Sequence, residues 1–525
     1  MAESTKMLNI VFFSCLLQFA SPATPCNSRD YGNGSPVCVC NAQSCDAVAP
    51  VEPVAENQAV VYTSDKSGRR LERITVQFRS VQTGYFANIT LDASQTFQSI
   101  EGFGGAFTDA AGINIANLSD SAQDFLLKSY FSSDGIEYTI GRVPISSADF
   151  STRKYSYDDV PNDFSLTHFA LVEEDLKYKI PYIKAAQKLS QRQVKLFASS
   201  WSAPAWMKTS GRMESNGTLL GEPKPNDSYY TAWANYYVKF LQEYVKQNVS
   251  FWALTAQNEP TTGYLYDYDW QTQGFTAEMQ RDFIKYNLGP ALHQNGFENV
   301  SIMILDDQRF MLPSWAKTVL HDVDARKYVS HIAVHFYWDR FTPTKTLDMT
   351  HEEFPTFPLL ATEACVGTMG GPDQGKEHVI LGSWERAEIY AHDIIEDLNH
   401  WFVGWVDWNI ALDLEGGPNW AKNFVDSPII VNASAGEFYK QPMFYALGHF
   451  SKFLPPKSYR IGLSSNIDSS KIEMTAFTNA NGYKTVIAMN KGEAAVSISL
   501  MEQSKKGQVV DVNLPARGIV TVLWK

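Results

Sequence analysis

The stretch Thr255-Ala256-Gln257-Asn258-Glu259-Pro260 follows the apolar run Phe251-Trp252-Ala253-Leu254, and together they are typical of a buried strand that opens into a loop. Pro260 lacks a backbone donor and so ends the strand. Glu259 is then expected at the apolar rim of a core, a position that suits a general acid. Asn-Glu-Pro alone is weak support, because a solvated Glu at a strand end has the same pattern.

A second carboxylate occurs in the same setting. The run Phe357-Pro358-Leu359-Leu360-Ala361-Thr362 leads into Glu363, which lies 363 − 259 = 104 residues after Glu259. Three strand-plus-helix units of ~30–35 residues cover about this distance. In a (β/α)8 barrel, carboxylates that follow two strands three units apart face each other across the mouth. Two such acids are the minimum that cleavage of a glycosidic bond requires.

Eight apolar strands separated by helical patterns support a barrel, since eight is the number that a closed parallel barrel needs and 525 residues are enough to build it. The fourth strand leads to Glu259 and the seventh leads to Glu363. The predicted strands are 100–104, 138–144, 194–199, 251–256, 300–305, 331–336, 358–362 and 402–408, and the predicted helices are 120–131, 173–189, 229–246, 277–295, 312–322 and 384–401.

Segments with a period of two flank this region on both sides. One covers residues 59–98, and the other, residues 455–525, contains predicted strands at 471–478, 483–489, 509–514 and 519–524. Two β segments at opposite ends of a chain most simply form one sandwich. We therefore predict an α/β fold, a (β/α)8 TIM barrel over residues 99–454 with an accessory β-sandwich built from 59–98 and 455–525.

The composition is that of a globular protein, with 44% hydrophobic and 13% aromatic residues. The net charge of −13 argues against nucleic acid as a partner and against a purely electrostatic attachment to anionic membranes. Residues 1–23 are predicted to be a signal peptide, because the apolar run 7–20 is too short to span a bilayer and small residues follow it. No later apolar run in the sequence is long enough to predict a transmembrane segment.

Residues 24–58 form a small disulfide-rich segment in this prediction. The cysteines Cys26, Cys38, Cys40 and Cys45 allow three pairings, and a Cys38–Cys40 ring would be very tight, so we prefer Cys26–Cys38 with Cys40–Cys45. Zinc binding is the alternative, although the spacing lacks two C-x-x-C arms and the secretory route favours disulfides. Sequons support that route, with Asn33 disfavoured by Pro36. The glycosylation candidates are Asn88, Asn117, Asn216, Asn226, Asn248, Asn299 and Asn432.

Other strand ends add polar and aromatic side chains to the predicted mouth. A cation and a phenol donor, Arg142 and Tyr337, suit an ionised nucleophile at Glu363. The alternative is that the aromatic residues fill core gaps and Arg142 makes a structural ion pair. The further residues expected at the mouth are Asp149, which can accept sugar hydroxyls, Trp201 and Trp408, which can stack on a pyranose, and His335, Trp405 and Asp407.

Three more features have two interpretations each. Asn258 either binds the substrate 2-hydroxyl or caps the loop. The aromatic residues of the segment 264–270 either guide an apolar aglycone or pack. Cys365 lacks a Cys-His pairing in the sequence, so we interpret it as a wall residue and not as a thiol catalyst.

Longer motifs then carry a family resemblance over nearly the whole chain after residue 25. The chain resembles the lysosomal acid β-glucosidase (glucosylceramidase) family of retaining glycoside hydrolases. The motifs are Gly102-Phe103-Gly104-Gly105-Ala106, Thr108-Asp109-Ala110-Ala111, Trp201-Ser202-Ala203-Pro204-Ala205-Trp206, Asn258-Glu259-Pro260, Glu363-Ala364-Cys365-Val366-Gly367, Glu415-Gly416-Gly417-Pro418-Asn419-Trp420, Asn423-Phe424-Val425-Asp426-Ser427-Pro428 and Tyr439-Lys440-Gln441-Pro442-Met443.

The resemblance implies that Glu259 is the acid/base and Glu363 the nucleophile. It implies that the enzyme needs no cofactor and no metal and that its substrate is glucosylceramide in membranes. It also implies a lysosomal or secreted location, with anionic lipid and a saposin-like activator as further partners. The chain departs from the family at Gln257 and Ala148, where the family has an acidic residue and a cysteine, so aglycone preference stays open. By resemblance the glucose subsite consists of Asp149, Trp201, Asn258, Trp408 and Asn423, with His335 and Tyr337 beside the nucleophile.

Two other functions compete with glucosylceramide hydrolysis. The same chemistry could act on another β-glycoside, such as a steryl glucoside or a β-glycan. A catalytically silent carbohydrate- or lipid-binding protein is the alternative of another class. The presence of both Glu259 and Glu363 argues against the silent protein.

Overall fold

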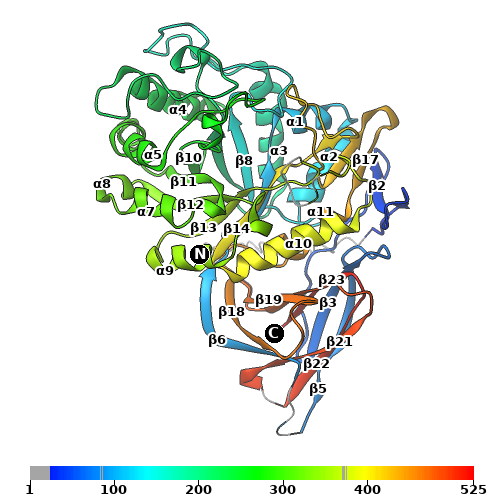
Figure 1. Ribbon diagram of the computed structural model, residues 1–525. Coiled ribbons are helices and arrows are strands. Elements are labelled where there is room, and N and C mark those ends of the chain that lie inside the picture. The colour runs from blue at the N-terminus through cyan, green and yellow to red at the C-terminus, as the bar shows by residue number, and fades with distance from the viewer. Residues whose placement is uncertain (1–23, 83, 85–86, 369–372, 374, 506) are drawn as a thin grey trace, which may run out of the picture.

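The computed structural model describes residues 24–525 apart from residues 83, 85–86, 369–372, 374 and 506. The predicted signal peptide lies outside the described residues. A closed barrel of eight parallel strands, with its helices around it, occupies the upper part of Figure 1, and a second β domain lies below it. The predicted combination of a TIM barrel and a β-sandwich is therefore confirmed.

The barrel strands follow the chain in order around the barrel, and each of the eight predicted strands overlaps one of them. Seven strands each contribute an apolar side chain to one shared cluster, which includes Ile140, Phe197 and Met303, so these side chains fill the barrel interior. The strands are β7 (Gly102–Ala106), β8 (Ile140–Ile145), β9 (Lys195–Ser200), β10 (Ala253–Thr255), β11 (Ser301–Gln308), β12 (Val329–His335), β13 (Leu359–Glu363) and β14 (Phe402–Asn409).

All six predicted helices are present, two of them interrupted by the π-helical turns Glu174–Lys179 and Ile284–Leu288. Four further helices, α1, α8, α9 and α11, were not predicted. The α-helices of the described chain are α1 (Asp109–Ala116), α2 (Asp120–Phe131), α3 (Ile180–Leu189), α4 (Ser228–Lys246), α5 (Ala277–Phe283), α6 (Gly289–Gln294), α7 (Ser314–Leu320), α8 (Val323–Arg326), α9 (Lys345–Glu353), α10 (Trp384–Asn399) and α11 (Pro442–Ser451). None of these helices is long and apolar enough to cross a membrane.

The second β domain joins strands from both ends of the chain in the order β4-β3-β23-β20-β19-β18-β6-β21-β22-β5. Alternate residues of these strands, such as Val61, Val486 and Val522, form a core separate from that of the barrel. The strands are β3 (Gln58–Asp65), β4 (Glu72–Gln77), β5 (Arg79–Ser80), β6 (Ile89–Ser99), β18 (Tyr459–Ser465), β19 (Ile472–Thr478), β20 (Lys484–Asn490), β21 (Val496–Glu502), β22 (Gln508–Leu514) and β23 (Gly518–Trp524). Strands β18 and β21 were not predicted.

The N-terminal segment is stapled as expected, by the disulfides Cys26–Cys38 and Cys40–Cys45. It does not stand apart from the rest of the chain, because its strand β2 (Val37–Asn41) pairs antiparallel with β17 (Glu437–Lys440) (Figure 1). The sheet has the order β1-β2-β17-β16-β15, where β1 is Ser28–Arg29, β15 is Leu412–Asp413 and β16 is Ile429–Asn432. The pairing of β2 with β17 therefore fastens the N-terminal segment to the part of the chain that follows the last barrel strand, and the disulfides brace this segment internally.

The sequons differ in exposure. Asn117, Asn226, Asn248 and Asn299 are exposed, whereas Asn88, Asn216 and Asn432 are partly buried. Asn432 also donates from its side-chain amide to the hydroxyl of Tyr439. Glycosylation stays a prediction, and the exposed asparagines are the better candidates for it.

A β-bulge in β11 positions side chains at the barrel mouth. The parallel register between β11 and β12 shifts between Leu305 and Asp307, and both Leu305 and Asp306 have positive φ angles, 69° and 56°. Bulges re-aim side chains next to functional sites. Here the bulge places Asp306 and Asp307 beside the end of β10.

Candidate active site

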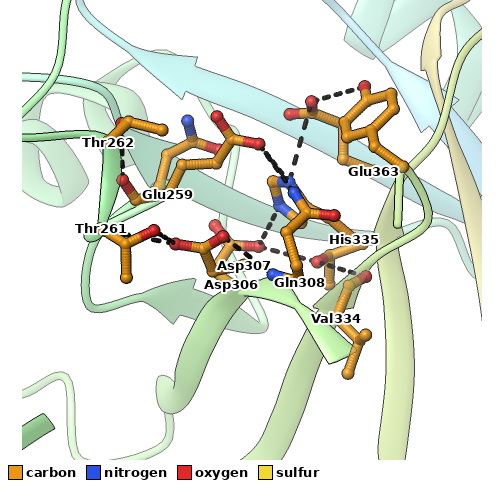
Figure 2. A network of polar contacts seen from close by, with 12 residues as sticks. Glu259, Thr261, Thr262, Asp306, Asp307, Gln308, Val334, His335 and Glu363 are labelled. Carbon is orange, nitrogen blue, oxygen red and sulfur yellow. Dashed lines mark hydrogen bonds and ion pairs between the residues drawn. The ribbon is translucent and has the colours of Figure 1, made fainter. Parts of the chain in front are cut away.

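The two glutamates predicted to face each other do so. Glu259 lies in the loop just after β10, and Glu363 is the last residue of β13. One carboxylate oxygen of each lies within 4.8 Å of the other and of a ring nitrogen of His335. Figure 2 shows the two carboxylates on either side of His335. Glu259 has a positive φ of 38°, a backbone strain that such sites can hold.

Arg142 on β8 is buried and reaches three partners in this cluster. Its guanidinium donates to Glu363, to Oδ1 of Asn258 at 2.8 Å and to Oδ2 of Asp306 at 2.9 Å. Burial alone would lower its pKa, but Asp306 and Glu363 outweigh this and raise it. Arg142 thus places a fixed positive charge between Glu363 of β13 and Asp306 of β11. It also holds the side chain of Asn258 through the amide oxygen.

His335, at the end of β12, joins the two glutamates to Asp306. Its Nδ1 lies 3.2 Å from Oε1 of Glu259 and 3.9 Å from Oε1 of Glu363, and its Nε2 lies 3.1 Å from Oδ1 of Asp306. Burial opposes protonation, but the carboxylates of Glu363, Asp306 and Glu259 raise the pKa of His335 to about 10. Burial would also raise the pKa of Asp306, yet Arg142 and His335 hold it well below its usual range. The site therefore contains a charged imidazolium as well as a guanidinium.

Each glutamate has further donors of its own. Tyr337 donates its hydroxyl to Oε1 of Glu363 at 2.7 Å, and the same hydroxyl lies 3.3 Å from Sγ of Cys365. Gln308 donates to Oε1 of Glu259 at 3.1 Å (Figure 2), and Tyr268 to Oε2 at 3.4 Å. Cys365 is buried and unoxidised, with its pKa raised by burial, which suits a wall residue better than a nucleophile.

Asp307 is a second buried carboxylate beside Glu259. It accepts hydrogen bonds from the backbone nitrogen and the hydroxyl of Thr261, at 3.2 and 2.7 Å (Figure 2). Burial and the charge of Glu259 raise the pKa of Asp307 to about 6. Its charge therefore changes within the pH range in which a glycosidase works.

The side chains expected around a sugar also meet here. Asn423 donates to Oδ2 of Asp149 at 2.9 Å, while Oδ1 of Asp149 is buried without a hydrogen-bond partner. Burial raises the pKa of Asp149 to about 7. The indoles of Trp201 and Trp408 stack on each other, with ring centroids 5.1 Å apart. Stacking of these rings on a pyranose stays a prediction.

A cavity of about 780 Å³ opens over these groups. Both glutamates, Asp149 and Asn423 line it, as do several apolar side chains toward its edge. Three of these apolar side chains are strongly exposed, namely Leu265 at 53%, Phe310 at 50% and Trp338 at 47%. We call these three residues the apolar rim.

Two residues expected at the mouth are elsewhere. Trp405 donates from its indole to Asp393 of α10, and Asp407 accepts from Tyr390 of the same helix, so both side chains face outward from the barrel. The prediction was wrong because alternate residues of a strand point to opposite faces. Asp306, Asp307 and Gln308 were not predicted at the mouth, although they follow the apolar run Met303-Ile304-Leu305 just as Glu259 follows its strand.

A closed (β/α)8 barrel in which one glutamate follows the fourth strand and another ends the seventh is the arrangement of a glycoside hydrolase that uses two carboxylates. Comparison with known families agrees. The model of the glycosyl hydrolase family 30 TIM-barrel domain matches residues 100–454, and that of the family 30 beta sandwich domain matches residues 457–522. The chain belongs to glycosyl hydrolase family 30.

Individual relatives are similar over almost their entire length. The chain is 46% identical to "Lysosomal acid glucosylceramidase" of Mus musculus and to "Putative glucosylceramidase 4" of Caenorhabditis elegans, covering 99% of each. These alignments include 99% of this chain. Among solved structures it resembles SrfJ from Salmonella typhimurium, with a TM-score of 0.80 and 28% identity over 89% of this chain and 99% of that one.

Proposed function

We propose that the protein hydrolyses the β-glucosidic bond of glucosylceramide, releasing glucose and ceramide with retention of configuration. The observation that carries the mechanism is the short separation of Glu259 and Glu363, since one carboxylate oxygen of Glu259 lies within 4.8 Å of one carboxylate oxygen of Glu363. Carboxyl groups about 5–5.5 Å apart fit a retaining enzyme, and about 6.5–9.5 Å an inverting one. The relatives named as glucosylceramidases support the choice of substrate.

The reaction takes two displacements. Glu363 attacks C1 of the glucosyl group while Glu259 gives its proton to the glycosidic oxygen, so the C1–O bond breaks and ceramide leaves as the alcohol. Glu259 then takes a proton from water, whose oxygen attacks C1 and displaces the Glu363 carboxylate. Glucose leaves with the β configuration, and Glu259 is protonated again.

The charges around the two glutamates support this sequence of proton transfers. When Glu259 is protonated, Arg142 and His335 balance the ionised Glu363 and Asp306. Formation of the glucosyl ester removes the charge of Glu363 while Glu259 becomes ionised, so the balance is kept. A buried cluster that stays neutral avoids the cost of an unpaired charge at each stage.

The glucose would occupy the inner part of the cavity. Asp149 offers a buried oxygen without a partner, which fits a sugar hydroxyl as donor. Asn258 and Asn423 offer amide groups, held by Arg142 and Asp149 respectively. We assign Trp201 and Trp408 to the wall of the same subsite, and Tyr337 to orientation of the nucleophile.

The apolar rim favours a lipid aglycone over a polar one. Three exposed apolar side chains at a cavity edge would contact the ceramide chains as the enzyme meets a membrane. We accordingly propose a lysosomal or secreted protein that acts at the membrane surface, for which the signal segment and the lysosomal relative are the supports. Anionic lipid and a saposin-like activator remain proposed partners by family resemblance.

The test combines stereochemistry with a panel of substrates. NMR of the first sugar released should show β-glucose, and early α-glucose would contradict a nucleophilic Glu363. Glucosylceramide, a steryl glucoside and a β-glycan, each offered at equal glycoside concentration, should be cleaved in that order of kcat/KM. A preference for the glycan would assign the site to a polysaccharide hydrolase. No cleavage of a chromogenic β-glucoside would indicate the silent binding protein.

A further inference from the structure

Groups of potential metal ligands occur at four places among the described residues. Three of the four already have an explanation. Cys40 and Cys45 are joined in a disulfide, and Glu259, His335 and Glu363 belong to the candidate active site. In the third group, Asp339 and Asp397 pair with Arg309, and Asp393 accepts from the indole of Trp405. The fourth group consists of Asp158, Asp163 and His168, and neither the fold nor the proposed reaction accounts for it.

These three residues lie in the loop that connects β8 to the π-helical turn Glu174–Lys179. One carboxylate oxygen of Asp158, one of Asp163 and one ring nitrogen of His168 lie within 4.8 Å of one another. The closest approach is between Nδ1 of His168 and Oδ2 of Asp163, at 2.7 Å. Three potential ligands thus converge from within eleven residues of one loop, counting from 158 to 168.

One carboxylate oxygen of Asp158 is buried and lacks a hydrogen-bond partner. Asp158 is only 2% exposed, and its Oδ1 accepts a hydrogen bond from the backbone nitrogen of Val160 at 3.2 Å. Its Oδ2 is buried and has no hydrogen-bond partner. Leaving a buried carboxylate oxygen unpaired costs free energy, so this atom requires a proton or a cation.

Surrounding contacts hold the ligands in place, as a metal site requires. Oδ2 of Asp163 accepts from the hydroxyl of Thr167 at 2.8 Å and from the backbone nitrogen of His168 at 2.9 Å. The carbonyl of Asp158 accepts from the indole of Trp206 at 3.0 Å. The loop is therefore fastened to the segment that follows β9, and its carboxylates are positioned without an ion.

We propose that Asp158, Asp163 and His168 form a binding site for a divalent transition metal ion. Two carboxylate oxygens and one imidazole nitrogen are ligands that Zn²⁺ accepts, and the exposed His168 leaves a position open to water. The ion would lie between the ring nitrogen of His168 and the carboxylate of Asp163, and it would pair the free oxygen of Asp158. Because the loop is tied to Trp206, an ion here would stabilise the fold around β9 and would take no part in hydrolysis.

The test is a calorimetric titration of the full-length protein with zinc at pH 7. Wild type should bind one equivalent, and its melting temperature should rise with zinc. Asp158→Asn and His168→Gln should each weaken this binding by more than about tenfold. The matched control is His321→Gln, because His321 is also 61% exposed and pairs with a carboxylate, Glu353, at 3.1 Å.

A crystal soaked in zinc gives an independent measurement. Anomalous scattering at the zinc edge should show a peak between Asp158, Asp163 and His168, and hydrolysis of an aryl glucoside should be the same in wild type and in Asp158→Asn. A wild-type protein that binds no zinc, a peak elsewhere, or binding that His321→Gln weakens as much as His168→Gln would each overturn the proposal. In those cases the group is a hydrogen-bonded His–Asp pair beside a protonated Asp158.

Discussion

Nδ1 of His335 lies 3.2 Å from Oε1 of Glu259, so the imidazolium touches the group that we propose as acid and base. The other ring nitrogen is fixed by Asp306, 3.1 Å away. With a pKa of about 10, His335 keeps its charge throughout the working range of pH. We therefore expect the proton that moves during the reaction to belong to Glu259, while His335 stays protonated.

The two glutamates should respond differently to loss of charge. Glu363→Gln should abolish turnover of every glycoside, because no other side chain can attack C1. Glu259→Gln should still form the glucosyl ester from aryl glucosides with good leaving groups, which need no protonation, and then stall. Stopped-flow measurement of phenol release should show a burst in Glu259→Gln and none in Glu363→Gln.

Azide distinguishes the roles of the glutamates a second time. Because azide needs no general base, it should restore turnover in Glu259→Gln and give β-glucosyl azide. α-Glucosyl azide from Glu363→Gln would agree with a nucleophile at Glu363. β-Glucosyl azide from Glu363→Gln would exchange the two roles, and the absence of any rescue in Glu259→Gln would remove the general base from that residue.

Asp307 should set the alkaline limit of activity. Its pKa is about 6, so near neutral pH its negative charge disfavours loss of the proton from the adjacent Glu259. Asp307→Asn should therefore move the alkaline limb of the kcat/KM profile to lower pH, by about one unit. The acidic limb is the internal control and should stay in place. An alkaline limb that does not move would show that the two carboxyls do not interact.

The sequence was sufficient for the barrel and for the two glutamates, because each rests on a strong local pattern. Eight apolar runs alternate with helical segments, and the loops after the fourth and seventh strands carry acids. Local patterns could not place Asp306 and Asp307, since a bulge and two positive φ angles at Leu305 and Asp306 turn them into the mouth. The fifth strand was predicted to end at 305, whereas β11 continues to Gln308.

Long-range pairing explains most of what else was missed. Strand β21 of the sandwich pairs in parallel with β6, a partner about four hundred residues away in the chain, as in Leu500 with Ile89. In the N-terminal segment, β2 pairs with β17, which also lies about four hundred residues away in the chain. Trp405 and Asp407 were placed on the wrong face of β14, because a run of eight buried residues has no alternation to indicate which side chains point inward.

The apolar rim should matter for lipid substrates alone. Leu265→Ser, Phe310→Ser or Trp338→Ser removes an apolar side chain that would lie against a lipid chain, which costs about 1.5 kcal/mol, or roughly tenfold in kcat/KM. Hydrolysis of glucosylceramide in vesicles should fall by this factor, while a short aryl glucoside should be cleaved as before. The control is Ile74→Ser, since Ile74 is 51% exposed on β4 of the other domain. Equal losses on both substrates would assign the rim to the glucose subsite.

Stability should be highest at acidic pH, because several buried carboxyls have raised pKa values. Burial raises the pKa of Asp149 to about 7 and the pKa values of Asp307 and Asp393 to about 6, from an ordinary value of 3.8. A raised carboxyl pKa means that the folded state binds the proton more tightly, so its stabilisation is complete below about pH 4 and is lost as the pH rises through the folded pKa. His449 opposes this trend, because burial lowers its pKa to about 3.

Three carboxyls lose their stabilising effect as the pH rises, and only His449 opposes them in this comparison. The melting temperature should therefore fall between pH 4.5 and pH 7.5. Asp149 alone accounts for on the order of 4 kcal/mol over the full range from its unfolded to its folded pKa. Asp149→Asn resembles the protonated acid at every pH and should reduce the fall, whereas Asp269→Asn, at an exposed carboxylate on the same cavity, should leave it unchanged. Differential scanning calorimetry at several pH values measures both slopes. A wild-type melting temperature that rises toward neutral pH would mean that these carboxyls are ionised in the folded protein.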